Sequence, residues 1–387
     1  MRILYDHQIF TRQRYGGVSR YFYELMDQFS RTPDINFSLA IRYSYNENLC
    51  NRHVLDQYWS KRSPLFCNKH IFPAIHRITN IDVLQRMRIN QKESVRLLNK
   101  QDFDTFHPTY YDPFFLQYIQ KKPFVLTVYD MIHELYPDYF PSDNPTKIWK
   151  RVLIEKAGAI IAISDNTKKD ILKFTQVDPD RISVVYLGNP FEYIQHQDQS
   201  TIPLDNTLLE KSYILFVGTR SGYKNFGFFI QSVVPLLQKY TNLQVYCAGG
   251  GPFTLHDLKN FNELNIISQV KYFEINDIRM RDLYKNARAF IFPSLYEGFG
   301  LPILEAFSCG CPVILCNSSS LAEIGADAAC YFDPYDPELL VQRIENLLTD
   351  NHFRDKLIKK GFERLNLFSW EKIAQDTKKV YDKISYQ

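Results

Sequence analysis

Long apolar runs are absent from this chain of 387 residues. Its longest apolar segments have the length of a strand, whereas a membrane-spanning helix needs about 18–20 apolar residues in a row. The first residues lack the hydrophobic segment of a secretory signal, so we expect the chain to stay in the cytoplasm. The seven cysteines show no CxxC spacing, which argues against a disulfide framework or a zinc site and indicates reduced thiols.

Several catalytic motifs are also missing. The strings HExxH, GxSxG and GxxxxGK[ST] do not occur, so zinc-peptidase, α/β-hydrolase and P-loop chemistries have no support. A Gly-Gly pair near the start lacks the GxGxxG spacing and the acidic partner of a nicotinamide site, which excludes a dehydrogenase. Two DxD strings, at 102–104 and 178–180, border a strand and a turn. We therefore predict no metal site and no cofactor.

Basic residues are concentrated in one stretch, although the formal net charge is only +3. Residues 51–100 hold ten Lys and Arg against three acidic residues, interleaved with Tyr58, Trp59, Phe66 and Phe72. This mixture suits docking on an anionic membrane surface. A solvated helix face explains it equally well. Nucleic-acid binding would show a similar pattern but ranks last, so we predict no nucleic-acid partner.

Short strand-like runs alternate with longer helix-like segments. Most runs are continuously apolar, as in parallel strands covered on both faces, and the alternation predicts an α/β fold with doubly wound sheets. The pattern occurs twice, which predicts a domain over 1–190, a linker over 191–212 and a domain over 213–369. We expect the domains to face each other across a cleft that binds ligands. The predicted strands are 2–7, 36–42, 105–108, 124–129, 159–163, 182–186, 213–217, 244–248, 270–273, 289–292, 313–315 and 330–332.

The strongest chemical motif follows the predicted strand 289–292. It runs from Glu297 through a glycine-rich turn to Pro302, a residue suited to the first turn of a helix. The backbone amides of this turn would lie at the positive end of the helix dipole, where phosphates bind. A diphosphate would repel Glu297 and Glu305, so we expect these two to bind hydroxyl groups of a sugar and a ribose. The predicted site residues in this motif are Glu297, Gly298, Phe299, Gly300, Leu301 and Glu305.

A second loop follows the predicted strand 213–217. After Gly218 it carries Arg220 and Lys224, which would neutralise phosphate charge in the same cleft. An Arg and a Lys on a loop are usually solvated, so this prediction depends on the neighbouring anion site. The triplet centred on Gly250 follows another predicted strand. It indicates either close approach by a flat base or a simple turn.

Two loops of the first half are further candidates. Gly16 and Gly17 precede a helix-like segment and would present amides to a phosphate or a sugar. Asp130 and His133 follow the predicted strand 124–129 and would meet a substrate hydroxyl. A structural role for His133 is equally compatible with the sequence.

The string from Glu297 to Glu305 resembles the E-x7-E motif of the retaining glycosyltransferases of family 4, which have the GT-B fold. The resemblance covers nearly the whole chain, because Gly16-Gly17 resembles the family's amino-terminal glycine loop and the loop from Gly218 to Lys224 its phosphate-binding loop. It implies two Rossmann-like domains, with a nucleotide-diphosphate sugar bound mainly by the second and an acceptor by the first. It also implies that the final helix, over 370–387, packs back on the first domain.

The resemblance implies a role for each matching residue. Glu297 and the amides of residues 299–301 would hold the donor hexose and the diphosphate, Glu305 the ribose, and Arg220 with Lys224 the phosphates. Family members usually need no metal. Many members carry a His-Asp pair where this sequence has Tyr129-Asp130, so Tyr129 or His133 would replace that His. Arg220 lies one position later than the Arg of the family, and Thr219 stands in its place.

The implied activity is transfer of a hexose, with retention, to a hydroxyl of a saccharide or lipid-linked acceptor. The specific expectation is mannose from GDP-mannose in surface polysaccharide or lipopolysaccharide synthesis, at the inner face of the membrane. Donors of rhamnose, glucose or N-acetylhexosamine are the alternatives, and a catalytically silent sugar-binding partner of another transferase is the rival. The expected catalytic set is Glu297, Arg220, Lys224, His133 and Asp130.

Overall fold

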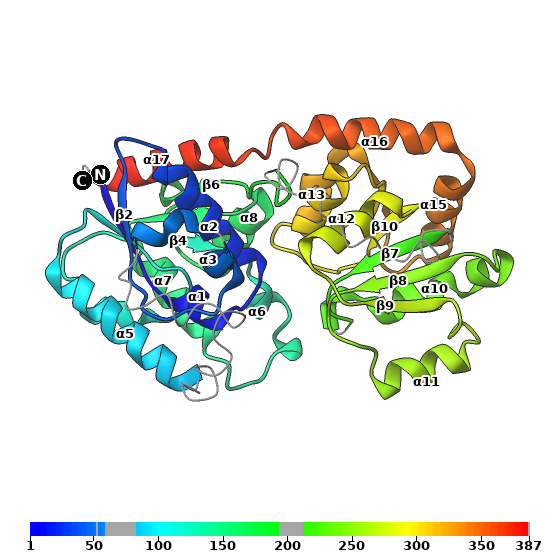
Figure 1. Ribbon diagram of the computed structural model, residues 1–387, viewed down its shortest axis with the longest axis horizontal. Helices are drawn as coiled ribbons and strands as arrows, with labels where there is room; N and C mark the ends of the chain where they lie inside the picture. Colours follow the sequence, from blue (N-terminus) through cyan, green and yellow to red (C-terminus); the bar gives the residue numbers. More distant parts are fainter. Residues whose placement is uncertain (52, 59–82, 193–211, 221, 386–387) are drawn as a thin grey trace. The chain divides into compact units, whose positions relative to one another are not determined.

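The computed structural model describes residues 1–51, 53–58, 83–192, 212–220 and 222–385 (Figure 1). The chain divides into two compact units, Met1–Gly188 together with Trp370–Gln387, and Asn189–Ser369. Most of the predicted linker lies outside the described residues. Each unit is built on parallel strands joined through helices, as expected for the predicted fold class.

The first unit places its strands in the order β2-β1-β3 and β4-β5-β6, all parallel. A parallel bridge between Phe106 and Phe124 connects β3 to β4. The order reverses between β1 and β3, which makes their carboxyl ends the switch point of this unit. The elements are β1 (Arg2–Tyr5), α1 (Gln8–Arg12), α2 (Gly17–Ser30), β2 (Asn36–Leu39), α3 (Glu47–Asn51), η1 (His53–Tyr58), α5 (Val83–Lys100), β3 (Thr105–His107), η3 (Pro113–Gln117), β4 (Val125–Val128), α6 (Ile132–Leu135), η4 (Pro137–Tyr139), α7 (Thr146–Lys156), β5 (Ala159–Ala162), α8 (Asp165–Phe174), η5 (Pro179–Arg181) and β6 (Ile182–Val184).

The carboxyl-terminal helix α17 (Trp370–Ser385) belongs to the first unit, where it packs against α2 and β5 (Figure 1). The Tyr381 hydroxyl lies 2.6 Å from His107 Nδ1 and 2.9 Å from the Tyr5 hydroxyl, all three buried. Trp370 covers Gly188 so closely that a Cβ there would lie 2.3 Å from its ring. The first unit therefore needs the end of the chain to complete its core.

The second unit has the strand order β12-β11-β10-β7-β8-β9, again all parallel. Every residue of β8, β10 and β11 is buried, because helices cover a parallel sheet on both faces. The order reverses between β7 and β10. The elements are β7 (Tyr213–Val217), η7 (Gly222–Lys224), α10 (Phe226–Lys239), β8 (Gln244–Ala248), α11 (Leu255–Glu263), β9 (Val270–Phe273), α12 (Asp277–Asn286), β10 (Ala289–Phe292), α13 (Leu301–Ser308), β11 (Val313–Cys316), α14 (Ser319–Gly325), η8 (Ala326–Ala328), β12 (Ala329–Phe332), α15 (Pro337–Thr349) and α16 (Asn351–Leu365).

Candidate functional site

The carboxyl ends of β7 and β10 meet at the switch point of the second unit. β7 pairs with β8 on one side and with β10 on the other. From β7 the chain continues to β8, and from β10 it continues to β11, in the opposite direction along the sheet. The connections therefore diverge between β7 and β10, and open α/β sheets bind ligands in the crevice at such a point. The loops that follow the two strands, 218–225 and 293–300, carry most of the predicted donor-binding residues.

Lys224 and Glu297 join these two loops through an ion pair. Lys224 ends η7, and its Nζ lies 2.6 Å from Glu297 Oε1. The two side chains are only 17% and 14% exposed, so water screens their attraction less than at an open surface. The Leu295 amide also donates to the Tyr223 carbonyl at 2.8 Å. The structure thus brings together two predicted catalytic residues that lie 73 positions apart in the sequence.

Helix α13 begins at Leu301, directly after the glycine turn. Its N-cap, Gly300, has φ +105°, a left-handed conformation that favours glycine, and Pro302 occupies the first turn. Phe299 is buried, and its ring lies 5.9 Å from that of Phe368, which anchors the turn. The amides of residues 299–301 therefore stand at the positive end of the helix, an arrangement that favours an anion.

A row of three serines, Ser318–Ser320, holds the loop after β10; we name it the serine clamp. Ser318 Oγ donates to the Ser294 carbonyl at 3.2 Å. The amide of Glu297 donates to Ser319 Oγ at 2.9 Å, and Ser320 Oγ donates to the Glu297 and Phe299 carbonyls at 2.8 and 2.9 Å. The clamp could not be identified from the sequence. Its only signal was a serine run after the predicted strand 313–315.

Glu305 lies inside α13 and accepts a hydrogen bond from a buried tyrosine. The Tyr284 hydroxyl on α12 donates to Glu305 Oε2 at 3.0 Å. Burial and the nearby carboxylate raise the pKa of Tyr284 well above its ordinary value, so the hydroxyl stays protonated and remains a donor. Tyr284 therefore orients the carboxylate predicted to bind ribose. A single Tyr in a helix gave no sequence signal for this role.

Arg220 lies at the same edge of the sheet, where it binds three backbone carbonyls and pairs with one carboxylate. Its guanidinium donates to the carbonyls of Gly249, Gly251 and Pro252 at 3.2, 2.7 and 2.6 Å. Its Nε lies 3.6 Å from Asp257 Oδ2, and its side chain is only 6% exposed. Arg220 thus fixes the glycine triplet after β8, while its contact with a phosphate stays a prediction.

Two glycines allow the loops after β7 and β8 to approach each other. Gly218 donates its amide to the Ala248 carbonyl at 2.9 Å. Gly250 has φ +70°, and a Cβ there would lie 2.6 Å from the Gly218 carbonyl oxygen. Close backbone packing therefore requires glycine at position 250, and the triplet is a structured turn; the base contact stays a prediction.

In the first unit, the residues predicted to meet the acceptor follow β4. The Asp130 side chain is one-third exposed, and its Oδ1 accepts from the Ile132 amide at 3.1 Å. The His133 ring stacks on Phe140 with centroids 4.1 Å apart. Burial and the charge of Lys150 lower the pKa of His133, so the imidazole is neutral at pH 7. Among the described residues, its Nδ1 has no hydrogen-bond partner.

Tyr129, the residue at the position of the family's His, is buried in the first unit. Its hydroxyl donates to the Thr109 carbonyl at 3.3 Å, and its amide donates to the Tyr111 hydroxyl at 2.9 Å. Burial raises the pKa of Tyr129 well above the ordinary value. The Tyr129 hydroxyl thus has a partner inside its own unit, and the choice between Tyr129 and His133 as a donor contact stays a prediction.

Asp6, which no sequence motif indicates, lies at the switch point of the first unit. Its Oδ1 accepts from the Thr109 hydroxyl and amide at 2.6 and 2.9 Å, and its Oδ2 from Gln8 Nε2 at 2.7 Å. These bonds join the loops after β1 and β3, although burial raises the pKa of Asp6 to about 6. Nearby, Gly16 caps α2 and Gly17 is its first residue.

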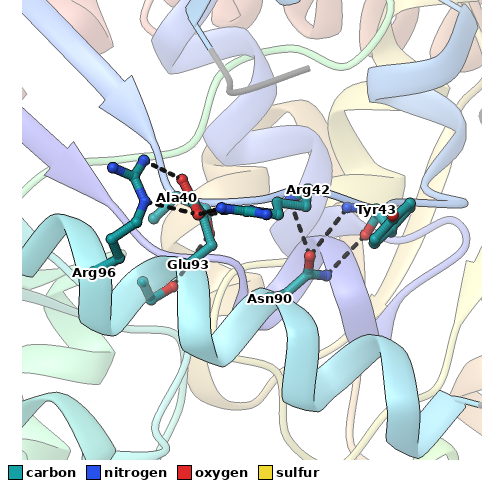
Figure 2. Close-up of polar contacts among 7 residues, drawn as sticks. Ala40, Arg42, Tyr43, Asn90, Glu93 and Arg96 are labelled. Atoms are coloured by element: carbon teal, nitrogen blue, oxygen red, sulfur yellow. Dashed lines mark hydrogen bonds and ion pairs between the residues drawn. The ribbon is translucent and has the colours of Figure 1, made fainter. Parts of the chain in front are cut away.

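The basic stretch 51–100 is described only in part, and Trp59, Phe66 and Phe72 lie outside the described residues. In its described helix, α5, Glu93 pairs with Arg42 at 2.6 Å and Arg96 at 2.5 Å (Figure 2). Asn90 Oδ1 also accepts from the Arg42 amide at 2.9 Å, as Figure 2 shows. Glu93 and Asn90 therefore anchor α5 to the loop after β2, and Arg96, a basic residue of the stretch, pairs with Glu93 inside the helix. None of the helices in the described ranges is both long and apolar enough to cross a membrane.

Comparison with known proteins agrees with this geometry. Residues 15–190 match the model of Glycosyltransferase Family 4, and residues 200–364 match that of Glycosyl transferases group 1. The O-antigen chain mannosyltransferase B of Escherichia coli is 28% identical over 306 residues, 75% of this chain and 77% of that protein. The O-antigen chain mannosyltransferase RfbU of Salmonella typhimurium is 27% identical over 222 residues, 56% of this chain and 59% of that protein.

Solved structures share the fold at low sequence identity. HepE from Anabaena, in complex with UDP and glucose, has a TM-score of 0.71 at 16% identity, with 98% of each chain covered. The lipopolysaccharide outer core galactosyltransferase WaaB, in its apo form, has a TM-score of 0.62 at 14% identity, with 99% of each chain covered. The second matched region includes the switch point of the second unit and the strand–EGFG–helix motif. The chain belongs to the GT-B glycosyltransferases of group 1 and family 4.

Proposed function

We propose that the protein transfers a hexose, with retention, from a nucleotide-diphosphate sugar bound at the switch point of the second unit. The observation that carries the proposal is the Lys224–Glu297 ion pair beside the start of α13. A cation and a helix amino terminus attract a diphosphate, while a carboxylate attracts sugar hydroxyls. The arrangement therefore suits a nucleotide-diphosphate sugar, which has both a diphosphate and sugar hydroxyls.

The chemistry assigned to these residues is charge stabilisation and positioning. The acceptor oxygen forms a bond to the anomeric carbon while the bond from that carbon to the β-phosphate oxygen breaks. The acceptor proton passes to the leaving phosphate on the same face of the sugar. Lys224 and the amides at the start of α13 stabilise the charge on the departing diphosphate. Glu297 holds the hexose, and Glu305, oriented by Tyr284, holds the ribose.

We further propose mannose as the transferred sugar and GDP-mannose as the donor. Support comes from the names of the relatives, two of which are O-antigen chain mannosyltransferases. HepE binds UDP and glucose, so a UDP-sugar is a rival donor, together with donors of rhamnose or N-acetylhexosamine. The proposed acceptor is a saccharide or a lipid-linked saccharide of a surface polysaccharide, such as lipopolysaccharide.

The reaction proposed here uses no metal and no cofactor. Lys224 and the positive end of α13 supply the charge that a divalent cation would otherwise bring to the diphosphate. Transfer that is unchanged in EDTA would support this part of the proposal. Loss of transfer in EDTA, with recovery on adding Mg²⁺ or Mn²⁺, would contradict it.

We also propose that the protein works in the cytoplasm at the inner face of the membrane. The support is the excess of seven positive charges over residues 51–100, which favours an anionic surface. Co-sedimentation with vesicles of anionic lipid, weaker with neutral vesicles and in high salt, would support it. Equal binding to both kinds of vesicle would contradict it.

The decisive experiment is a transfer assay with a panel of nucleotide sugars, followed by NMR of the product. We expect one donor, GDP-mannose, to give a product with the anomeric configuration of the donor. Inversion at the anomeric carbon would refute the retaining mechanism. A chain that neither transfers the sugar nor hydrolyses any donor of the panel would instead support the rival, a catalytically silent sugar-binding partner.

A further inference from the structure

Helix α7 buries a lysine in its middle. Lys150 is fully buried, whereas Lys147, Arg151 and Lys156 on the same helix are exposed. Burying an ammonium group is costly unless carboxylates and hydrogen bonds replace its water. The position of Lys150 therefore depends on the groups that surround it.

Those groups come from the segment after β4, which holds Asp130 and Glu134, and from the loop after β3. Lys150 Nζ lies 2.7 Å from Glu134 Oε2 and donates to the Asp130 carbonyl at 2.9 Å. It also lies 3.8 Å from Asp130 Oδ1 and 5.7 Å from the centre of the Tyr111 ring. Lys150 thus contacts both the main chain and the side chain of Asp130, which follows β4. It also contacts Tyr111 in the loop after β3.

The two oxygens of the Asp130 carboxylate differ in their surroundings. Oδ1 accepts from the Ile132 amide at 3.1 Å and faces Lys150. Oδ2 accepts no hydrogen bond from the described residues, and the side chain is 33% exposed. The carboxylate is therefore held by one oxygen while the other stays available to a ligand.

We propose that Lys150 is a positioning residue, which holds Asp130 so that its Oδ2 accepts a hydrogen bond from the hydroxyl of an acceptor sugar. The inference rests on the proposed function, in which the first unit binds the acceptor. Parallel strands place the ends of β1, β3 and β4 at one edge of the sheet, so Asp130 lies at the same edge as the switch point. Glu134 balances the lysine charge, and Asp130 contacts the acceptor.

The test compares Lys150→Met, Lys150→Arg and the double variant Lys150→Met/Glu134→Gln, with Lys147→Met as an exposed control on the same helix. Three quantities are measured for each: transfer to acceptor, donor hydrolysis without acceptor, and melting temperature. We expect Lys150→Met to lower kcat/KM for the acceptor about 10- to 100-fold. Donor hydrolysis, which depends mainly on the second unit, should stay within about twofold.

The double variant separates positioning from folding. Lys150→Met leaves the Glu134 carboxylate buried without its cation. Adding Glu134→Gln removes that unpaired charge, so the melting temperature should recover. Transfer should not recover, because nothing then holds Asp130. Lys150→Arg keeps the charge and should regain part of the transfer. Recovery of both stability and transfer in the double variant would overturn the positioning role, as would wild-type transfer in Lys150→Met.

Asp130→Asn distinguishes this inference from the function on which it rests. If Asp130→Asn transfers at the wild-type rate, the carboxylate has no role toward the acceptor and the inference fails. If Asp130→Asn is impaired and Lys150→Met is not, only the role of Lys150 fails. If the wild-type protein uses no nucleotide sugar at all, the proposed function itself fails.

Discussion

Substituting Glu297 by Gln should separate binding of the diphosphate from binding of the sugar. In the structure, Glu297 neutralises Lys224 at 2.6 Å. A bound diphosphate therefore competes with Glu297 for the same ammonium group. Gln keeps the shape of the side chain but removes its charge, so Lys224 would become fully available to phosphate.

The size of the effect follows from the geometry of the pair. A hydrogen bond to a charged group contributes about 1.5–3 kcal/mol, and partial exposure of both side chains reduces this to about 1–2 kcal/mol. A nucleoside diphosphate should therefore bind Glu297→Gln about 5- to 30-fold more tightly. Sugar transfer should fall about 100-fold, because the charged contact with the hexose is lost.

Isothermal titration calorimetry with GDP and UDP measures the first effect, and steady-state transfer measures the second. Lys224→Met is the matched control, since it removes the other half of the pair and should weaken both binding and transfer. A Glu297→Gln variant that binds the nucleoside diphosphate more weakly than the wild type would refute the reasoning. It would mean that Glu297 supports the diphosphate rather than the sugar.

Three further predictions concern the loops around the two switch points. Burial raises the pKa of Asp6 from 3.8 to about 6, so its share of stability is fully present below pH 4, and about 3 kcal/mol is lost as the pH rises from about 4 through 6. Urea unfolding across this range should show that dependence in the wild type and not in Asp6→Asn. Gly250→Ala should lower the free energy of unfolding by more than about 2 kcal/mol, because its Cβ meets the Gly218 carbonyl at 2.6 Å, while Gly251→Ala, with φ +80° and open space, should cost only about 1 kcal/mol; equal losses would argue against the close approach. Ser320→Ala removes the hydroxyl that binds two carbonyls of the loop after β10 and should weaken donor binding about tenfold in calorimetry; unchanged affinity would argue that the serine clamp does not shape the donor site.

The strands could be predicted because each is a local apolar run. Among the described residues, all twelve predicted strands are present, and several end one to three residues earlier than predicted. At β1 and β2 the excess residues belong to the loops, where the Asp6 carboxylate accepts from Thr109 and the Arg42 side chain donates to Glu93. The start of α13 could also be predicted, because Gly300 and Pro302 are local helix-start signals.

The contacts that organise the site could not be predicted, because they join residues far apart in the chain. The sequence places Arg220 and Lys224 on one loop, but the fold directs Arg220 to the carbonyls after β8 and Lys224 to Glu297. In the sequence, Lys150 is one of several cations of its helix, and only its burial in the structure distinguishes it from the others. The role of Tyr284 depends in the same way on packing between α12 and α13.

The central claim is that the switch point of the second unit binds the nucleotide-diphosphate sugar. The most direct measurement is the dissociation constant of each nucleotide sugar of a panel, by calorimetry, for the wild type and for Lys224→Met. We predict that GDP-mannose binds the wild type and that Lys224→Met weakens this binding at least about tenfold. Equal affinity in the two proteins, or no binding of any nucleotide sugar to the wild type, would contradict the account.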